Sequence, residues 1–161
     1  MAKLQDIIQW CDQTLKSTEF KDYAPNGLQI EGKTEVRKIL AAVTASQDAI
    51  DAAIRENADL LLVHHGYFWK GEAYPITGMR GKRIKSLIQH DISLLAYHLP
   101  LDSHPSLGNN AAIADLLKLE RIEALDPSER HPIGNIGYLN QPMPVEEFKT
   151  FVSEKLKFDV T

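Results

Sequence analysis

The chain has 161 residues and a formal net charge of −4, and 43% of its residues are hydrophobic while 25% are charged. This length and composition allow one substantial hydrophobic core, so we expect a single domain comprising residues 1–161. Non-specific nucleic-acid binding requires a basic surface that neutralises phosphates, and the net negative charge argues against such a partner. No apolar segment approaches the length that spans a bilayer, so we expect no membrane association.

The first predicted element is a helix, because apolar residues recur at helical spacing from Leu4 to Leu15. The single cysteine, Cys11, lies on the apolar face of this helix and has no partner for an internal disulfide. We therefore interpret Cys11 as a core thiol in a reducing compartment. Together with the lack of a targeting signal, this indicates a cytoplasmic protein.

Strand and helix patterns follow in alternation. Pro25-Asn26-Gly27 marks a turn before a short strand at residues 28–30, and residues 38–44 have the pattern of a buried strand. Ser46 is the expected N-cap of a helix whose apolar residues share one face.

The pattern then repeats. An apolar strand opens at Asp59 and ends in His64-His65, and a helix around residues 82–90 leads to a second apolar strand at 92–97. Repeated strand–helix–strand units favour right-handed crossovers and parallel pairing. We predict an α/β fold with a mixed, largely parallel sheet and loops that bind metal at the carboxyl ends of its strands.

The carboxyl-terminal third contains shorter patterns. Asn109 or Asn110 can cap a helix, and residues 134–139 can form a short strand with permissive glycines. Residues 145–156 predict a last helix that begins with Glu146-Glu147 at its positive end. We expect the apolar and aromatic stripe of this helix to be core.

Potential metal ligands cluster after the two predicted apolar strands. His64 and His65 end one strand, and His98, Asp102 and His104 follow the other, so four of the six histidines lie in two short stretches. Ligands bind at the carboxyl ends of strands in open α/β sheets. Imidazole and carboxylate groups suit zinc, iron, manganese or nickel. Such histidines can also serve only as hydrogen-bonding groups, and an Asp before Ser can cap a turn, but the shared placement favours a metal site.

Several spaced motifs resemble those of a known family, the NIF-three-like dinuclear metal-centre proteins, which include the GTP cyclohydrolase 1 type 2 homologues. The matching segments, in chain order, are NGLQIEG at 26–32, VTAS at 43–46, LVHHG at 62–66, YHLPLDSHP at 97–105 and LGNNA at 107–111. The resemblance extends from the first helix to about residue 160. It implies His64, His65 and Asp102 as metal ligands, two metal ions per subunit, and ring-shaped homohexamers.

The resemblance also implies ligands that this sequence does not contain. Family members continue further and contribute a His and a Glu from a carboxyl-terminal segment, whereas this sequence ends at Asp159-Val160-Thr161, where a new strand begins. We therefore expect an amino-terminal portion of a longer family member, with an incomplete site that holds one metal ion.

The activity that the resemblance implies is opening of the guanine ring of GTP by metal-activated water. His98 and His104 would move protons, because imidazole titrates near physiological pH, although either could instead be a further ligand. Two alternatives stay open. The chain could be a non-catalytic metal-binding or partner-binding protein, or a hydrolase of another nucleotide or phosphate-containing substrate.

Two groups of residues are candidates for substrate binding. Trp69 and Lys70, four and five residues after His65, could stack on a purine and meet phosphate, or could pack the loop against the core. Arg80 and Arg83 could form a phosphate-binding patch, or could be the solvated face of a helix.

Overall fold

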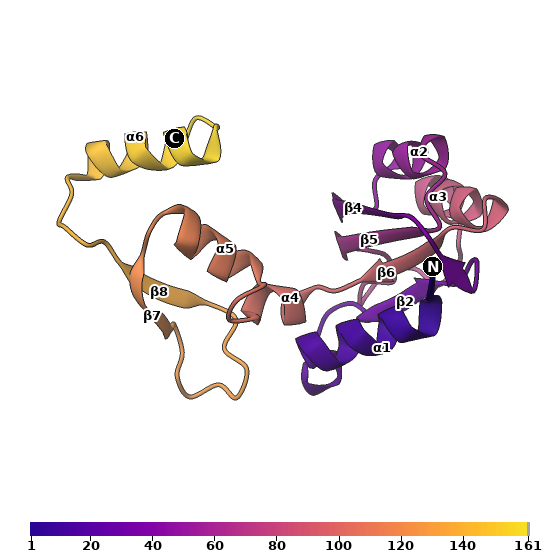
Figure 1. Ribbon diagram of the computed structural model, residues 1–161, viewed down its shortest axis with the longest axis horizontal. Coiled ribbons are helices and arrows are strands. Elements are labelled where there is room, and N and C mark those ends of the chain that lie inside the picture. Colours follow the sequence, from indigo (N-terminus) through magenta and orange to yellow (C-terminus); the bar gives the residue numbers. More distant parts are fainter. Residues whose placement is uncertain (161) are drawn as a thin grey trace. The chain divides into compact units, whose positions relative to one another are not determined.

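The computed structural model describes residues 1–160. The chain divides into two compact units, one comprising Met1–Pro100 and the other beginning at Leu101 (Figure 1). A compact unit is not necessarily a domain that folds independently. The expectation of one domain across the whole chain therefore stays a prediction.

The first unit is built on a four-stranded sheet in the order β2-β6-β5-β4. Its strands are β2 (Gly27–Ile30), β4 (Ile39–Thr44), β5 (Leu60–His65) and β6 (Ser93–Ala96). β5 pairs in parallel with both β4 and β6, while β2 pairs antiparallel with β6. The predicted mixed, largely parallel sheet is confirmed.

Two crossover helices, α2 (Gln47–Arg55) and α3 (Gly78–Gln89), pack against this sheet and enclose the main hydrophobic core (Figure 1). Ser46 caps α2 as predicted, because its side chain accepts a hydrogen bond from the Ala49 backbone N–H. Leu61 and Val63 belong to this core. Their neighbour Leu60 is also fully buried, but it is not part of this core cluster. Alternate residues of β5 are thus buried on both faces of the sheet, as is usual for parallel strands.

The remaining elements of the first unit precede or flank the sheet. They are α1 (Leu4–Leu15), which packs against β2, the short 3-10 helix η1 (Ser17–Glu19), and the antiparallel pair of β1 (Ala2–Lys3) and β3 (Glu35–Val36). Cys11 is buried on α1, which confirms the predicted core thiol. The helix α3 begins four residues earlier than the sequence pattern predicted.

The prediction that residues 38–44 form a buried strand is wrong for one of its faces. β4 lies at the edge of the sheet, and the side chains of Ile39 and Val43 are 47% and 69% exposed. An apolar run does not show whether a neighbour covers both faces of the strand, so tertiary position decided the burial of β4.

In the second unit, α5 (Asn109–Leu116) is followed by the antiparallel strands β7 (Glu120–Ala124) and β8 (Asn135–Tyr138) and by α6 (Val145–Leu156). A short helix, α4 (Leu99–Ser103), precedes them in the chain. Gly108, and neither Asn109 nor Asn110, is the N-cap residue of α5.

Two further sequence predictions about the second unit need correction. None of the described residues of α6 is fully buried, so the aromatic stripe of this helix is not core. The strand β7 was not predicted from the sequence. In the described part of the chain, no helix has both the length and the apolar content needed to cross a membrane.

Candidate metal centre

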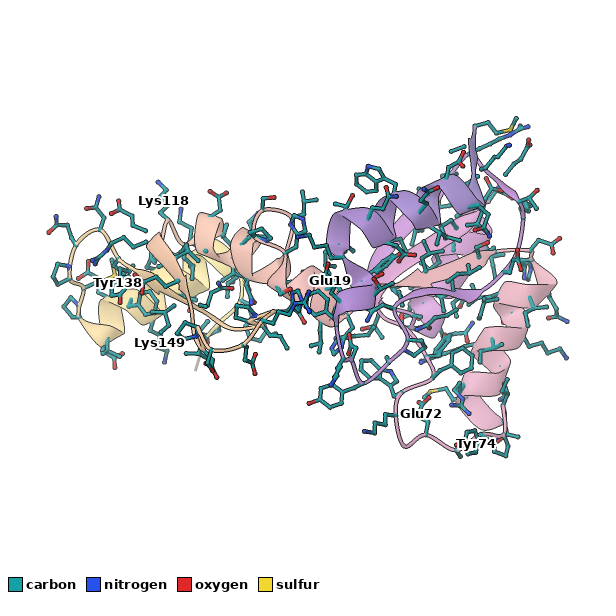
Figure 2. The ribbon with its side chains drawn as sticks, turned by 90° about the horizontal axis from the view of Figure 1, so that it is seen from below. Glu19, Glu72, Tyr74, Lys118, Tyr138 and Lys149 are labelled. Carbon is teal, nitrogen blue, oxygen red and sulfur yellow. The ribbon has the colours of Figure 1, made fainter. Side chains whose placement is uncertain are left out.

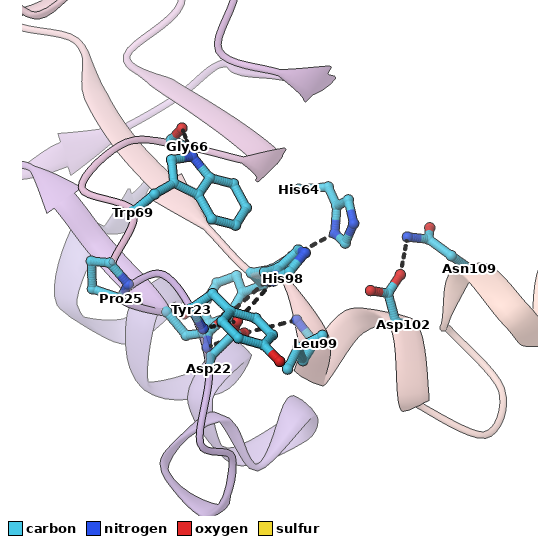
Figure 3. A network of polar contacts seen from close by, with 12 residues as sticks. Asp22, Tyr23, Pro25, His64, Gly66, Trp69, His98, Leu99, Asp102 and Asn109 are labelled. Atoms are coloured by element: carbon cyan, nitrogen blue, oxygen red, sulfur yellow. Dashed lines mark hydrogen bonds and ion pairs between the residues drawn. The ribbon is translucent and has the colours of Figure 1, made fainter. Parts of the chain in front are cut away.

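Three imidazoles meet at the carboxyl end of the parallel strands. His64 and His65 end β5, and His98 follows β6, its parallel neighbour. One ring nitrogen from each of these histidines lies within 4.8 Å of the corresponding nitrogens of the other two. The centroids of the His64 and His65 rings are 4.3 Å apart, and those of His64 and His98 are 5.0 Å apart. Figure 3 labels His64 and His98. The three rings, each half-buried, could contact one ion.

The convergence of two consecutive histidines depends on the end of the strand. Side chains of neighbouring strand residues normally point to opposite faces. The pairing of β4 with β5 ends at Thr44 and His65, and the chain leaves the strand at Gly66. A Cβ atom on Gly66 would overlap the Gln29 carboxamide and lie 2.7 Å from Cβ of Ala96. Gly66 is therefore a place of close approach that excludes a side chain.

Hydrogen bonds to the Nδ1 atoms indicate which ring nitrogens would be available to bind an ion. Nδ1 of His64 is 3.0 Å from the Tyr97 carbonyl oxygen, which can only accept, so this nitrogen carries the proton. The lone pair of His64 is then on Nε2, the arrangement usual in metal-binding histidines. Nδ1 of His65 is 3.2 Å from the Thr44 hydroxyl, which can donate or accept. Three imidazoles arranged in this way could hold a metal ion.

His98 is held by a buried carboxylate. Its Nδ1 lies 2.7 Å from Oδ1 of Asp22, and the side chains of Asp22 and His98 are only 3% and 17% exposed (Figure 3). Burial alone raises the pKa of Asp22, but the hydrogen bonds that it receives from His98, Asn26 and two backbone N–H groups outweigh burial and lower the pKa below its usual range. Asp22 is therefore an anion that can only accept at neutral pH.

The loop that carries Asp22 is tied to both segments that carry the histidines. Oδ1 of Asn26 accepts a 2.8 Å hydrogen bond from the backbone N–H of His98. The carbonyl of Tyr23 accepts a 2.6 Å hydrogen bond from the backbone N–H of Lys70. Sequence reasoning interpreted this region only as a turn and missed Asp22. Asp22 and Asn26 are four residues apart in a segment with no periodic pattern, so only their position before a strand of the sheet could have indicated a role.

Asp102 and His104 belong to the second unit. Oδ1 of Asp102 accepts a 2.8 Å hydrogen bond from Nδ2 of Asn109, which restrains this carboxylate. Nδ1 of His104 is an acceptor for the backbone N–H groups of Ser106 and Leu107, at 3.3 and 3.0 Å. Because Nδ1 accepts, the proton of a neutral His104 is on Nε2, which could donate it but could not bind a metal in that form. The roles predicted for Asp102 and His104 stay predictions.

Trp69 packs against the histidines. Its indole Nε1 donates a 3.2 Å hydrogen bond to the carbonyl of Gly66, and its ring meets the His98 ring edge-on with centroids 4.9 Å apart (Figure 3). The indole thus shields one side of the cluster. The adjacent Lys70 is exposed.

The two arginines proposed for phosphate binding differ in their contacts. Arg80 forms a 2.7 Å ion pair with Glu72 and donates to the carbonyls of Ala73 and Pro75, so it holds the loop before α3. Figure 2 shows Glu72 and Tyr74 on this loop. Arg83 is half-buried, and among the described residues its Nε atom is buried and has no hydrogen-bond partner. Their predicted role in substrate binding stays a prediction.

Comparison with known proteins shows the family. The model of the Duf34/NIF3 (NGG1p interacting factor 3) family matches residues 2–161. The chain belongs to the NIF3 family. The family resemblance predicted from the spaced motifs is confirmed.

Curated NIF3-family relatives have closely similar sequences. One is the "GTP cyclohydrolase 1 type 2 homolog" of Haemophilus influenzae, 51% identical over 152 residues, which are 94% of this chain and 60% of the relative. The protein of the same name from Escherichia coli is 46% identical over 154 residues, which are 96% of this chain and 60% of the relative. The chain therefore spans less than two thirds of the length of these relatives.

Solved structures of NIF3-like proteins share the fold. "Protein ybgI, unknown function" matches with a TM-score of 0.91 and 44% identity, over 98% of this chain and 62% of that structure. TTHA1606 from Thermus thermophilus matches with a TM-score of 0.86 and 34% identity, over 98% of this chain and 63% of that structure.

Proposed function

We propose that this chain is the metal-binding part of a metal-dependent hydrolase that opens the ring of GTP. The observation that carries the proposal is the cluster of His64, His65 and His98, whose ring nitrogens lie within 4.8 Å of one another. The names of the curated relatives support GTP as the substrate. Cytoplasmic location and assembly into homohexamers are parts of the same proposal.

The candidate site residues have separate tasks in this proposal. His64, His65 and His98 would hold the ion, and the family resemblance adds Asp102. The bound ion would supply Lewis acidity and lower the pKa of water towards neutrality. Trp69 would exclude bulk water from one side of the ring of His98, which it contacts edge-on. The contacts of His98 favour a role as a ligand over a role in proton transfer. His104 stays the candidate for proton transfer.

Four residues are the candidates for substrate binding. Trp69 and Lys70 lie in the loop after the histidine pair, and Lys70 is exposed, so its ammonium group is accessible to a phosphate. Arg80 and Arg83 are the other candidates for phosphate contact. The buried Nε donor of Arg83 has no partner among the described residues, which favours Arg83 as the phosphate contact. The guanidinium group of Arg80 already holds the loop before α3.

The first experiment measures metal content after purification without a histidine tag. We expect up to about one zinc, iron, manganese or nickel ion per chain, lost in His64→Ala and in His65→Ala, because each removes a ligand. His90→Ala is the matched control, since His90 lies at the end of α3 and bonds to the Ser86 carbonyl. Asp102→Ala tests the ligand implied by resemblance. Equal metal in wild type and in the His64→Ala/His65→Ala double variant would refute the site.

The second experiment measures formate release from GTP by the metal-loaded chain. Formate is the expected product when the opened ring loses its formyl group. Protein that binds metal at the histidine cluster but releases no formate would contradict GTP ring opening. A non-catalytic metal-binding protein, or a hydrolase of another phosphate-containing substrate, would then replace it.

A further inference from the structure

Each oxygen of the Asp22 carboxylate faces two hydrogen-bond donors of the protein. Oδ1 receives the Tyr23 backbone N–H at 2.6 Å and faces Nδ1 of His98 at 2.7 Å. Oδ2 receives Nδ2 of Asn26 and the backbone N–H of Leu99, both at 2.9 Å. Two of these donors are backbone groups, so the carboxylate cannot rotate away from His98 without leaving backbone N–H groups unpaired.

We propose that Asp22 is a positioning residue that fixes His98 in the tautomer with its proton on Nδ1 and its lone pair on Nε2. A carboxylate with four donors around it cannot donate, so Nδ1 of His98 has to be the donor between them. Carboxylate–histidine pairs of this kind select the ring nitrogen that faces a metal and raise the basicity of that nitrogen. The tautomer stands on geometry alone, whereas its consequence for metal binding rests on the proposed function.

The orientation of His98 is fixed from three directions. Asp22 holds Nδ1, Asn26 holds the backbone N–H of His98, and the Trp69 ring meets the imidazole edge-on. The ring of His98 consequently has little freedom to flip. A flip would exchange Nδ1 with a carbon and leave the Asp22 carboxylate without this donor.

The deciding experiment measures the tautomer in the wild-type, metal-free protein. Long-range ¹H–¹⁵N correlation spectra, recorded at about pH 8.5 where imidazole is ordinarily neutral, distinguish a protonated from an unprotonated ring nitrogen. We expect protonated Nδ1 and unprotonated Nε2 for His98. His90 is the internal reference, because its Nδ1 faces a carbonyl oxygen at 2.8 Å and requires the same tautomer. A dominant Nε2-protonated form of His98 would overturn the proposal.

The matched variants are Asp22→Asn and Asp59→Asn. In Asp22→Asn, either orientation of the new amide directs its N–H groups towards existing donors. His98 then loses its anionic acceptor, so the population of its Nε2-protonated tautomer should increase. Cobalt(II) affinity, followed by its visible absorption, should fall by about 10- to 100-fold. Asp59 is also a buried carboxylate with several donors, but it lies at the opposite end of β5. Asp59→Asn should therefore leave both readouts unchanged.

The outcomes separate this proposal from the proposed function. The expected tautomer in a wild-type protein that binds no cobalt would refute the metal site and leave the positioning role intact. Folded Asp22→Asn with the wild-type tautomer would refute the positioning role and leave the metal site intact. If Asp22→Asn does not fold, the wild-type spectrum still decides.

Discussion

The side-chain Oε1 of Gln29 accepts a 2.7 Å hydrogen bond from the backbone N–H of Tyr67. This contact ties β2, the strand at one edge of the sheet, to the loop that follows the histidine pair. Nε2 of Gln29 donates in turn to the Pro25 carbonyl at 2.8 Å. One side chain thus connects the loop before β2 with the loop after β5, at the end of the sheet where the histidines lie.

Gly66→Ala should displace this side chain, because the new Cβ atom would overlap the Gln29 carboxamide. We expect a loss of about 1–3 kcal/mol in the free energy of unfolding, measured by urea denaturation. In a Gln29→Ala background the same substitution should cost less, since the overlap with the Gln29 carboxamide is removed. Strictly additive costs would show that Gln29 and Gly66 do not interact.

Asp59 should contribute stability that depends on pH. It is 7% exposed and accepts hydrogen bonds from the Lys33 ammonium at 2.8 Å and from two backbone N–H groups. The bond from Lys33, followed by those from the backbone, lowers the pKa of Asp59 below its ordinary value of 3.8.

A carboxyl whose pKa is lower in the folded than in the unfolded state stabilises the fold above its unfolded pKa. That stability is lost as the pH falls through the folded pKa. Asp59→Asn should therefore be less stable than wild type by about 2 kcal/mol at neutral pH. The difference should shrink below about pH 4. Urea denaturation at a series of pH values measures it, and a constant difference down to about pH 3 would contradict the assignment.

Arg80→Lys should loosen the loop before α3. The guanidinium group of Arg80 reaches Glu72 and the carbonyls of Ala73 and Pro75 at once, and a single ammonium group cannot reproduce this fork. Limited proteolysis should therefore cut the loop faster, by about threefold or more if about 0.7 kcal/mol of local stability is lost. Lys82→Ala, on the exposed side of the same helix, is the control, and equal cleavage in both variants would argue against a loop-holding role.

Cys11 should be inert towards thiol reagents in the native protein. Burial, and then the neighbouring Asp12 carboxylate, raise the pKa of the Cys11 thiol above its ordinary value. A disulfide reagent at neutral pH should react at least about tenfold more slowly with folded than with urea-unfolded protein. Equal rates would show that α1 opens readily or that the thiol is accessible.

The sequence determined the alternation of elements and the ligand-rich ends of two strands. The apolar run before His64-His65 and the run before His98 have buried-strand patterns, and the helix between them has a helical period of apolar residues. These are local properties, and the parallel pairing follows from general rules for strand–helix–strand units. The spaced motifs, each a short contiguous segment, also predicted the family.

Only the tertiary structure decided which groups surround the histidines and which faces are covered. The donors around Asp22 include His98 and Leu99, which are more than seventy residues away in the chain, so no local pattern predicts them. The exposure of Val43 on β4 follows from the position of that strand at the sheet edge, which periodicity does not encode. The tautomer of His64 likewise depends on the carbonyl of Tyr97, a backbone atom on a neighbouring segment that only the folded chain brings within hydrogen-bond distance.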